Sequence, residues 1–99
     1  MNKEKTLNLL GLARRANKTT TGEGLVVKSI QNKKAKFVFL ANDASNNLIK
    51  KITDKTNYYK ISMTDIFTTA ELSQAIGEPR KVIAVEDAGF AKKMGELME

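Results

Sequence analysis

The stretch FVFLA, residues Phe37–Ala41, decides the fold class of this 99-residue chain. All of its residues are apolar, so the segment has no face suited to water and is typical of a central strand buried on both sides. A second run, VIAVED, residues 82–87, begins with the same pattern. Strands of this kind need a covering layer on each face, which predicts a small sheet with helices on both sides.

Segments with helical spacing alternate with these strands. Residues 4–16 carry apolar side chains at three-residue steps and end in cations. Asn17 follows, a residue suited to the left-handed position that closes a helix. Further helical patterns cover residues 47–55, 70–77 and 88–99. The alternation predicts one ordered α/β domain over residues 1–99.

The stretch TTTGEGLVVKSI, residues 19–30, is expected to start another helix. Thr20 and Glu23 have the spacing of a capping box, in which a hydroxyl and a carboxylate satisfy free amides at a helix start. We therefore expect this helix to begin near Thr21. Its buried face is expected to comprise Leu25, Val26 and Ile30.

The sequence patterns that indicate secondary structure are weaker between the two apolar strands. NDASNN, residues 42–47, is typical of a turn in which Asp43 or Ser45 caps the next helix. NYYKIS, residues 57–62, is a short strand candidate whose tyrosines we expect to pack in the core or at a sheet edge. TDIF, residues 64–67, is expected to form a capped turn of helix.

The chain contains neither cysteine nor histidine. It therefore lacks a disulfide framework, thiolate metal sites and the usual zinc, haem and general-base constellations. Glu86 and Asp87 are adjacent after a strand, so they point in different directions and are interpreted as turn or N-cap residues. We expect no enzyme activity, no metal site and no cofactor.

Charge and hydropathy indicate the kind of partner. The chain has 17 Lys and Arg residues against 11 Asp and Glu, and the resulting net charge of +6 favours a polyanion such as nucleic acid. It has no stretch of about 18 apolar residues and no N-terminal apolar h-region. We therefore expect a cytoplasmic protein with no membrane partner.

The stretch TTTGEGLVVKSI also invites a phosphate-binding interpretation. It is not a P-loop, because Val27 rather than glycine precedes Lys28, and it lacks the third glycine of a dinucleotide fingerprint. Free amides at a helix start, bare backbone at Gly22 and Gly24 and a lysine within reach could still bind phosphate. A tightly packed helix start with a solvated lysine fits equally well, and these residues alone do not separate the two interpretations.

Five segments together resemble one protein family: LLGLARRANK, TTTGEGLVVKSI, KAKFVFLANDAS, AELSQAIG and VIAVEDAGFAKK. In order and over nearly the whole chain, they resemble the ribosomal-protein family of the seven-Ae type, whose members include kink-turn RNA binders. The likeness is closest to a short bacterial, YlxQ-like branch. The resemblance implies a three-layer α/β/α sandwich around a small four-stranded mixed sheet.

The resemblance also implies where RNA binds. In the kink-turn binders of this family, three segments meet on one surface: the start of the second helix, the turn after the central strand and the loop before the last strand. These correspond here to Gly22–Lys28, Asn42–Ile49 and Gly77–Lys81. The residues implied for RNA contact are Gly22, Glu23, Gly24, Leu25, Lys28, Asn42, Ser45, Ile49, Pro79 and Arg80.

The match at single positions is uneven. Gly22 and Lys28 agree with the family's helix start, but Gly24 replaces an asparagine and Leu25 a glutamate, the two side chains expected to read base edges. Direct base readout is therefore expected to be weakened. The turn residues Ser45 and Ile49 correspond to positions beside a flipped-out nucleotide, and Arg80 to a basic residue of the last recognition loop.

These observations predict a monomeric RNA-binding protein that docks on the backbone of a kinked or internally looped structured RNA. The RNA is expected to be linked to translation, with ribosomal RNA and the ribosome as candidate partners. The alternative is a protein-interaction module of the same fold with a lapsed RNA site, and a third candidate is the RNA-recruiting part of a modification enzyme. Binding that weakens steeply with salt favours the RNA interpretation.

Overall fold

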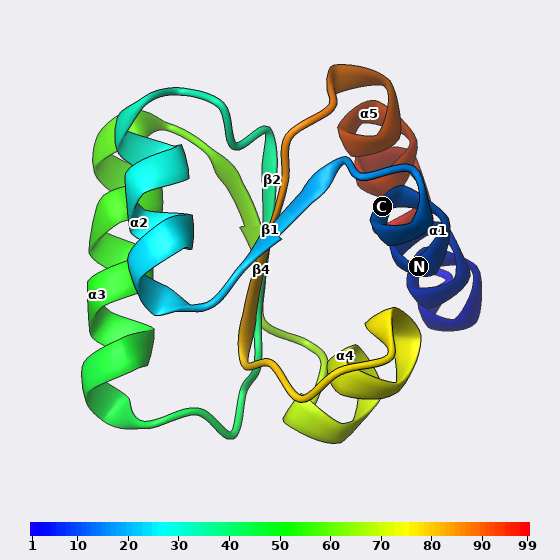
Figure 1. Ribbon diagram of the computed structural model, residues 1–99, viewed down its shortest axis with the longest axis horizontal. Helices are drawn as coiled ribbons and strands as arrows, with labels where there is room; N and C mark the ends of the chain where they lie inside the picture. The colour runs from blue at the N-terminus through cyan, green and yellow to red at the C-terminus, as the bar shows by residue number, and fades with distance from the viewer.

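The computed structural model describes residues 1–99 and has three layers, with helices on both faces of a four-stranded sheet (Figure 1). The helices are α1 Lys3–Arg15, α2 Glu23–Gln31, α3 Asn46–Tyr59, α4 Thr69–Ile76 and α5 Ala88–Leu97. The strands are β1 Thr19–Thr21, β2 Phe37–Leu40, β3 Ser62–Thr64 and β4 Val82–Val85. The predicted α/β/α sandwich with a mixed four-stranded sheet is confirmed.

The sheet has the order β1-β4-β2-β3. Strand β4 runs antiparallel to both of its neighbours, whereas β2 and β3 are parallel. Every residue of the two central strands, β2 and β4, is buried, as the apolar runs predict. One row of paired residues crosses the whole sheet and consists of Thr19, Val85, Phe37 and Ser62.

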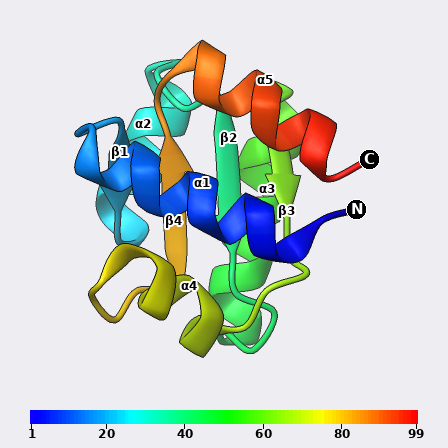
Figure 2. The ribbon, with the colours of Figure 1, turned by 90° about the vertical axis from the view of Figure 1, so that its right-hand side faces the viewer.

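The two helical layers differ in size. Helices α2 and α3 cover one face of the sheet, and α1, α4 and α5 cover the other (Figures 1 and 2). The chain ends lie side by side, because the Asn2 amide donates to the Leu97 carbonyl at 2.8 Å. The largest fully buried side chains include Phe39, Phe67, Leu10, Ile30, Leu40, Ile52, Leu72 and Ile83, drawn from both layers and the sheet.

The predicted capping box at Thr20 and Glu23 is wrong. Residues Thr19–Thr21 form β1 instead, because the central strand β4 offers them backbone partners. Helix α2 begins only at Glu23, and its N-cap, Gly22, makes no side-chain capping hydrogen bond. A capping box does occur at α4, where Thr68 and Glu71 satisfy each other's backbone amides.

The predicted buried face of α2 is wrong at Leu25, whose side chain is 63% exposed. The residues of α2 that are buried are Val26, Ser29 and Ile30. Moving the helix start from Thr21 to Glu23 shortens the helix but does not change which residues share a face. Leu25 lies outside because the sheet contacts Val26 and Ile30, four residues apart on one helix face.

The segment between α3 and α4 also differs from the prediction. Helix α3 continues through Tyr59 and ends at Lys60 in a left-handed conformation, so only Ser62 of NYYKIS lies in a strand. Tyr58 is 78% exposed rather than packed. TDIF forms no helical turn, because Thr64 ends β3 and the following residues lead irregularly into α4.

Several predicted helix ends are confirmed. Asn17 and Gly77 both have a positive φ after α1 and α4. The Ser45 hydroxyl caps α3 by accepting a hydrogen bond from the Leu48 amide at 3.2 Å. Asp87 caps α5 by accepting one from the Phe90 amide at 2.8 Å.

Candidate nucleic-acid interface

Three segments far apart in the sequence meet at one end of the sheet. Because β4 is antiparallel to both β1 and β2, the end of β1, the end of β2 and the start of β4 share one edge. This edge lies at the bottom of Figure 1. The segments are Gly22–Lys28, Asn42–Ile49 and Gly77–Lys81, and together they are called the three-segment surface here.

The first and third segments are joined by backbone and side chains. The Gly22 amide donates to the Val82 carbonyl at 3.2 Å. The Arg80 Nε donates to the Thr21 hydroxyl at 3.0 Å. The start of α2 and the loop before β4 are therefore held as one unit.

The second segment is fixed to both of the others. The Ala41 amide donates to the Lys81 carbonyl at 2.8 Å, which ties the end of β2 to the loop before β4. Lys51, in the first turns of α3, lies 2.9 Å from the Glu23 carboxylate at the start of α2. Each of these contacts joins one segment to a residue within two positions of another, so the three segments are held together in pairs.

Asp43 anchors the turn of the second segment to α4. Its Oδ1 accepts hydrogen bonds from the Thr69 amide at 2.9 Å and from the Thr69 hydroxyl at 2.6 Å. The hydrogen bond from the Thr69 hydroxyl, helped by that from its amide and by the charge of Lys81, lowers the pKa of Asp43 below its usual value. Asp43 is therefore committed to holding the turn, and the neighbouring Asn42 and Ser45 are exposed.

Arg80 is held in one orientation before any ligand binds. Besides its bond to Thr21, its Nη1 donates to the Pro79 carbonyl at 2.7 Å. Glu78 lies 3.7 Å from Arg80 and also 3.7 Å from Arg14, so one carboxylate serves two guanidinium groups. Five N–H donors are available on a guanidinium, so Arg80 keeps donors for a phosphate.

The outer face of α2 carries the other predicted contact residues. Gly24, Leu25 and Lys28 are exposed, and their spacing of three and four places them on one face of the helix. Lys28 lies six residues after Gly22, about 9 Å along the helix. Lys28 therefore shares a helix face with Gly24 and Leu25 but lies away from the end of the sheet where Arg80 is found. Ile49 is half-buried at the start of α3.

Sequence reasoning missed three charged residues of this region. Lys51 neutralises Glu23, Glu78 partly neutralises Arg80, and Lys81 is exposed without an ion-pair partner. Lys81 could have been found, because it directly follows Arg80 in the same predicted loop. The pairs of Lys51 with Glu23 and of Glu78 with Arg14 could not, because each joins residues that are far apart in the chain. The Glu78–Arg80 pair, in contrast, lies within one predicted loop.

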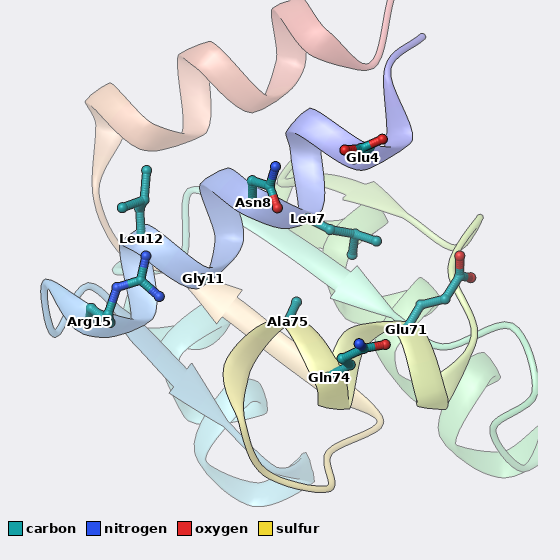
Figure 3. A pocket seen from close by; sticks show the side chains of 9 residues that line it. All are labelled: Glu4, Leu7, Asn8, Gly11, Leu12, Arg15, Glu71, Gln74 and Ala75. Carbon is teal, nitrogen blue, oxygen red and sulfur yellow. The ribbon is translucent and has the colours of Figure 1, made fainter.

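A groove between α1 and α4 shares no lining residue with the three-segment surface (Figure 3). Its volume is about 610 Å³, and Leu12, 49% exposed, is on its rim. Charges of both signs surround it. The lining residues are Glu4, Leu7, Asn8, Gly11, Leu12, Arg15, Glu71, Gln74 and Ala75.

Two further features bear on the kind of site. No group of three or more carboxylates or other metal-binding side chains comes together in the structure. None of the helices combines the length and the apolar character that crossing a bilayer requires.

Comparison with known proteins identifies the family. Residues 4–95 match the sequence profile of the ribosomal protein L7Ae/L30e/S12e/Gadd45 family. The chain is 53% identical over 98 residues to a protein of Enterococcus faecium named RNA-binding protein YlxQ, covering 99% of this chain and 95% of that protein. A protein of the same name from Bacillus subtilis is 51% identical over 92 residues, covering 92% of each.

Solved structures show the same fold. A Bacillus halodurans protein described as of unknown function has a TM-score of 0.91 at 43% identity, covering 95% of this chain and 96% of that one. A Giardia lamblia 15.5 kD RNA-binding protein has a TM-score of 0.81 at 19% identity, covering 93% and 83%. The chain therefore belongs to the ribosomal protein L7Ae/L30e/S12e/Gadd45 family.

Proposed function

We propose that residues 1–99 form one RNA-binding domain that binds the backbone of a kinked or internally looped RNA at the three-segment surface. The observation that carries this proposal is the meeting of Gly22–Lys28, Asn42–Ile49 and Gly77–Lys81 at one sheet edge. The family, the printed names of the two relatives and the net charge of +6 all support it.

Each part of the surface has a distinct role in this proposal. Lys28, Arg80 and Lys81 neutralise phosphates, since all three carry cationic donors at or beside the surface. The first turn of α2 presents the free amides of Glu23 and Gly24 to phosphate or base acceptors, and Gly22, whose own amide donates to Val82, leaves room for close approach.

The apolar and turn residues meet the bases. Leu25 and Ile49 offer apolar surface beneath an extruded base, and the exposed Asn42 and Ser45 border it. Pro79 stiffens the loop that presents Arg80. Because Gly24 and Leu25 lack base-reading groups, the protein prefers bent over straight RNA only modestly.

The RNA is a structured RNA of translation, with ribosomal RNA as the first candidate, and the protein acts in the cytoplasm as a monomer without enzymatic activity or cofactor. A protein-interaction module of the same fold is the alternative function. Its binding would rest on apolar surface and would respond weakly to salt.

The test is RNA affinity measured across a salt series for a Lys28→Ala/Lys81→Ala variant. Two lost phosphate contacts should reduce the slope of log affinity against log salt by about 1.4–1.8. The matched control is Lys5→Ala/Lys93→Ala, which removes the same charge from the exposed surface of α1 and α5. Equal losses in both variants, or no detectable RNA binding at low salt, would contradict the proposal.

A further inference from the structure

Five exposed lysines lie at the end of the sheet opposite the three-segment surface. They are called the lysine end here and comprise Lys18, Lys33, Lys34, Lys36 and Lys60. This end is at the top of Figure 1, where the connection from α2 to β2 and the last turn of α3 both lie.

The sheet register places the lysines beside one another. Lys18 and Lys36 directly precede two members of the paired row that crosses the sheet, and Lys60 lies two residues before a third. The Lys36 amide donates to the Val85 carbonyl at 2.7 Å, and the Lys18 carbonyl accepts from the Glu86 amide at 2.8 Å. The row covers three inter-strand spacings, about 14 Å. Lys33 and Lys34 extend it over the end of α2.

The lysine end carries an excess of positive charge. None of its five lysines forms an ion pair, whereas Arg80 and Lys51 at the three-segment surface do. Two carboxylates lie nearby: Glu86, whose amide donates to Lys18 and whose side chain accepts a hydrogen bond from the Ser29 hydroxyl at 2.6 Å, and Asp87, which caps α5. Both keep their negative charge, but the five lysines outnumber them. The end of the sheet away from the three-segment surface is therefore positively charged, and none of its lysines is held by an ion pair.

Two of these lysines occupy strained backbone positions. Lys33 has φ 61° and Lys60 φ 57°, a left-handed conformation that glycine adopts freely and side chains disfavour. Gly77 holds the corresponding position after α4. Compensation of the α2 dipole does not require a lysine at position 33, because Lys34 supplies that charge next to it. The left-handed conformation is a common way to end a helix, and lysine in place of glycine there adds positive charge at a conformational cost.

We propose that the lysine end is a second RNA-binding surface, which holds the phosphate backbone of an RNA helix flanking the loop bound at the three-segment surface. This inference rests on the proposed function. The chain measures 28 × 25 × 25 Å, so one folded RNA can reach both ends. Lysine ammonium groups bind phosphate as point charges and carry no planar fork for bases, so the contact is with backbone.

The test uses a Lys33→Gly/Lys60→Gly variant, which removes two charges and relieves the strain at both positions. Its melting temperature should equal or exceed that of the unaltered protein, so lost binding cannot be ascribed to unfolding. Lys5→Ala/Lys93→Ala is the charge-matched control. The probes are a short internal-loop RNA, the same loop with a stem of about 16 added base pairs, and a straight duplex of that length.

The unaltered protein should bind the extended RNA more tightly than the short one, and the glycine variant should lose this gain. For the glycine variant on the extended RNA, the slope of log affinity against log salt should fall by about 1.4–1.8. The control should keep both the gain in affinity from the added stem and the original slope. Equal binding of the extended RNA by the glycine variant and the unaltered protein overturns the proposal. So does competition by polyglutamate as strong as that by the duplex, which would make the lysine end a site for acidic protein.

The duplex separates this inference from the proposed function. If the internal loop is bound no better than the straight duplex, the loop-binding role of the three-segment surface fails. The lysine end is then still tested, because the glycine variant must bind the duplex more weakly than the control does. Equal duplex binding by the two variants overturns the inference on its own.

Discussion

Gly22 and Gly24, two residues apart, are glycines in different structural settings. Gly22 has φ 90° and ψ 150°, a region of backbone space that is essentially restricted to glycine. Gly24 lies inside α2, and a Cβ placed there would meet nothing within 4 Å. The structure therefore explains Gly22 by conformation, whereas Gly24 could be replaced without a clash in the free protein.

The two glycines should respond oppositely to alanine. Gly22→Ala should lower the free energy of unfolding by about 1–3 kcal/mol, the cost of holding a side chain in that region. Gly24→Ala should raise it by about 0.5 kcal/mol, because alanine loses less backbone entropy in a helix. Urea unfolding of both variants measures this, and a stable Gly22→Ala protein would show that its conformation is not required.

Gly24 and Leu25 also determine the expected specificity. The resemblance to the kink-turn binders implies asparagine and glutamate at these positions, and both positions are exposed here. A Gly24→Asn/Leu25→Glu variant should improve discrimination between an internal-loop RNA and a straight one by about 1–3 kcal/mol. Competition binding with the two RNAs measures this. Unchanged discrimination would mean that α2 does not face the bases.

At the scale of elements, α1 and α4 approach closely at Gly11. A Cβ at this position would lie 2.9 Å from the Ala75 carbonyl oxygen, and that oxygen belongs to the backbone of α4. Gly11→Ala should therefore lower the free energy of unfolding by about 1–3 kcal/mol, because the helices must separate. Gly95→Ala in α5, where a Cβ meets nothing, is the control and should not destabilise. Similar thermal stability of both variants would contradict this packing.

The turn after β2 should respond to acid through Asp43. Its pKa is lowered in the folded protein, chiefly by the hydrogen bond from the Thr69 hydroxyl, so its contribution to stability is present above the unfolded pKa of about 3.9. That contribution is lost as pH falls through the lower folded pKa. Asp43→Asn should therefore melt below the unaltered protein at neutral pH, and the difference should shrink below about pH 4. A difference that persists to lower pH would exclude this role.

Helices and strands with a clear pattern of apolar or capping residues were predictable from the sequence. Those whose form depends on contacts with neighbouring helices or strands were not. The apolar runs of β2 and β4 and the glycine end of α4 each carry their own signal. Strand β1 is a row of three threonines that forms because β4 lies beside it. The tyrosines before Lys60 have strand propensity, yet α3 continues through them because Thr56 and the preceding turns pack on the sheet.

The candidate site shows the same division. The three segments could be named from resemblance, because each carries a local motif. Their mutual bonds, such as Arg80 to Thr21, join residues 59 apart in the sequence. No local pattern contains such a pair, and the exposure of Leu25 likewise depends on which helix face meets the sheet.

At the scale of the whole molecule, charge is divided between the two ends of the sheet. At the three-segment surface, ion pairs with Glu23 and Glu78 hold Lys51 and Arg80 in place. At the lysine end the cations are unpaired. In the proposed function, the first end therefore recognises the shape of the RNA and the second adds attraction for its phosphates.

The central claim is that a looped RNA binds across the three-segment surface, and the most direct test is the change of backbone amide NMR shifts on adding a short internal-loop RNA. The largest changes should fall in Gly22–Lys28, Asn42–Ile49 and Gly77–Lys81 together. Amides of the α1/α4 groove, such as Asn8 and Gln74, should change little. Changes concentrated in that groove, with the three segments unaffected, would contradict the account.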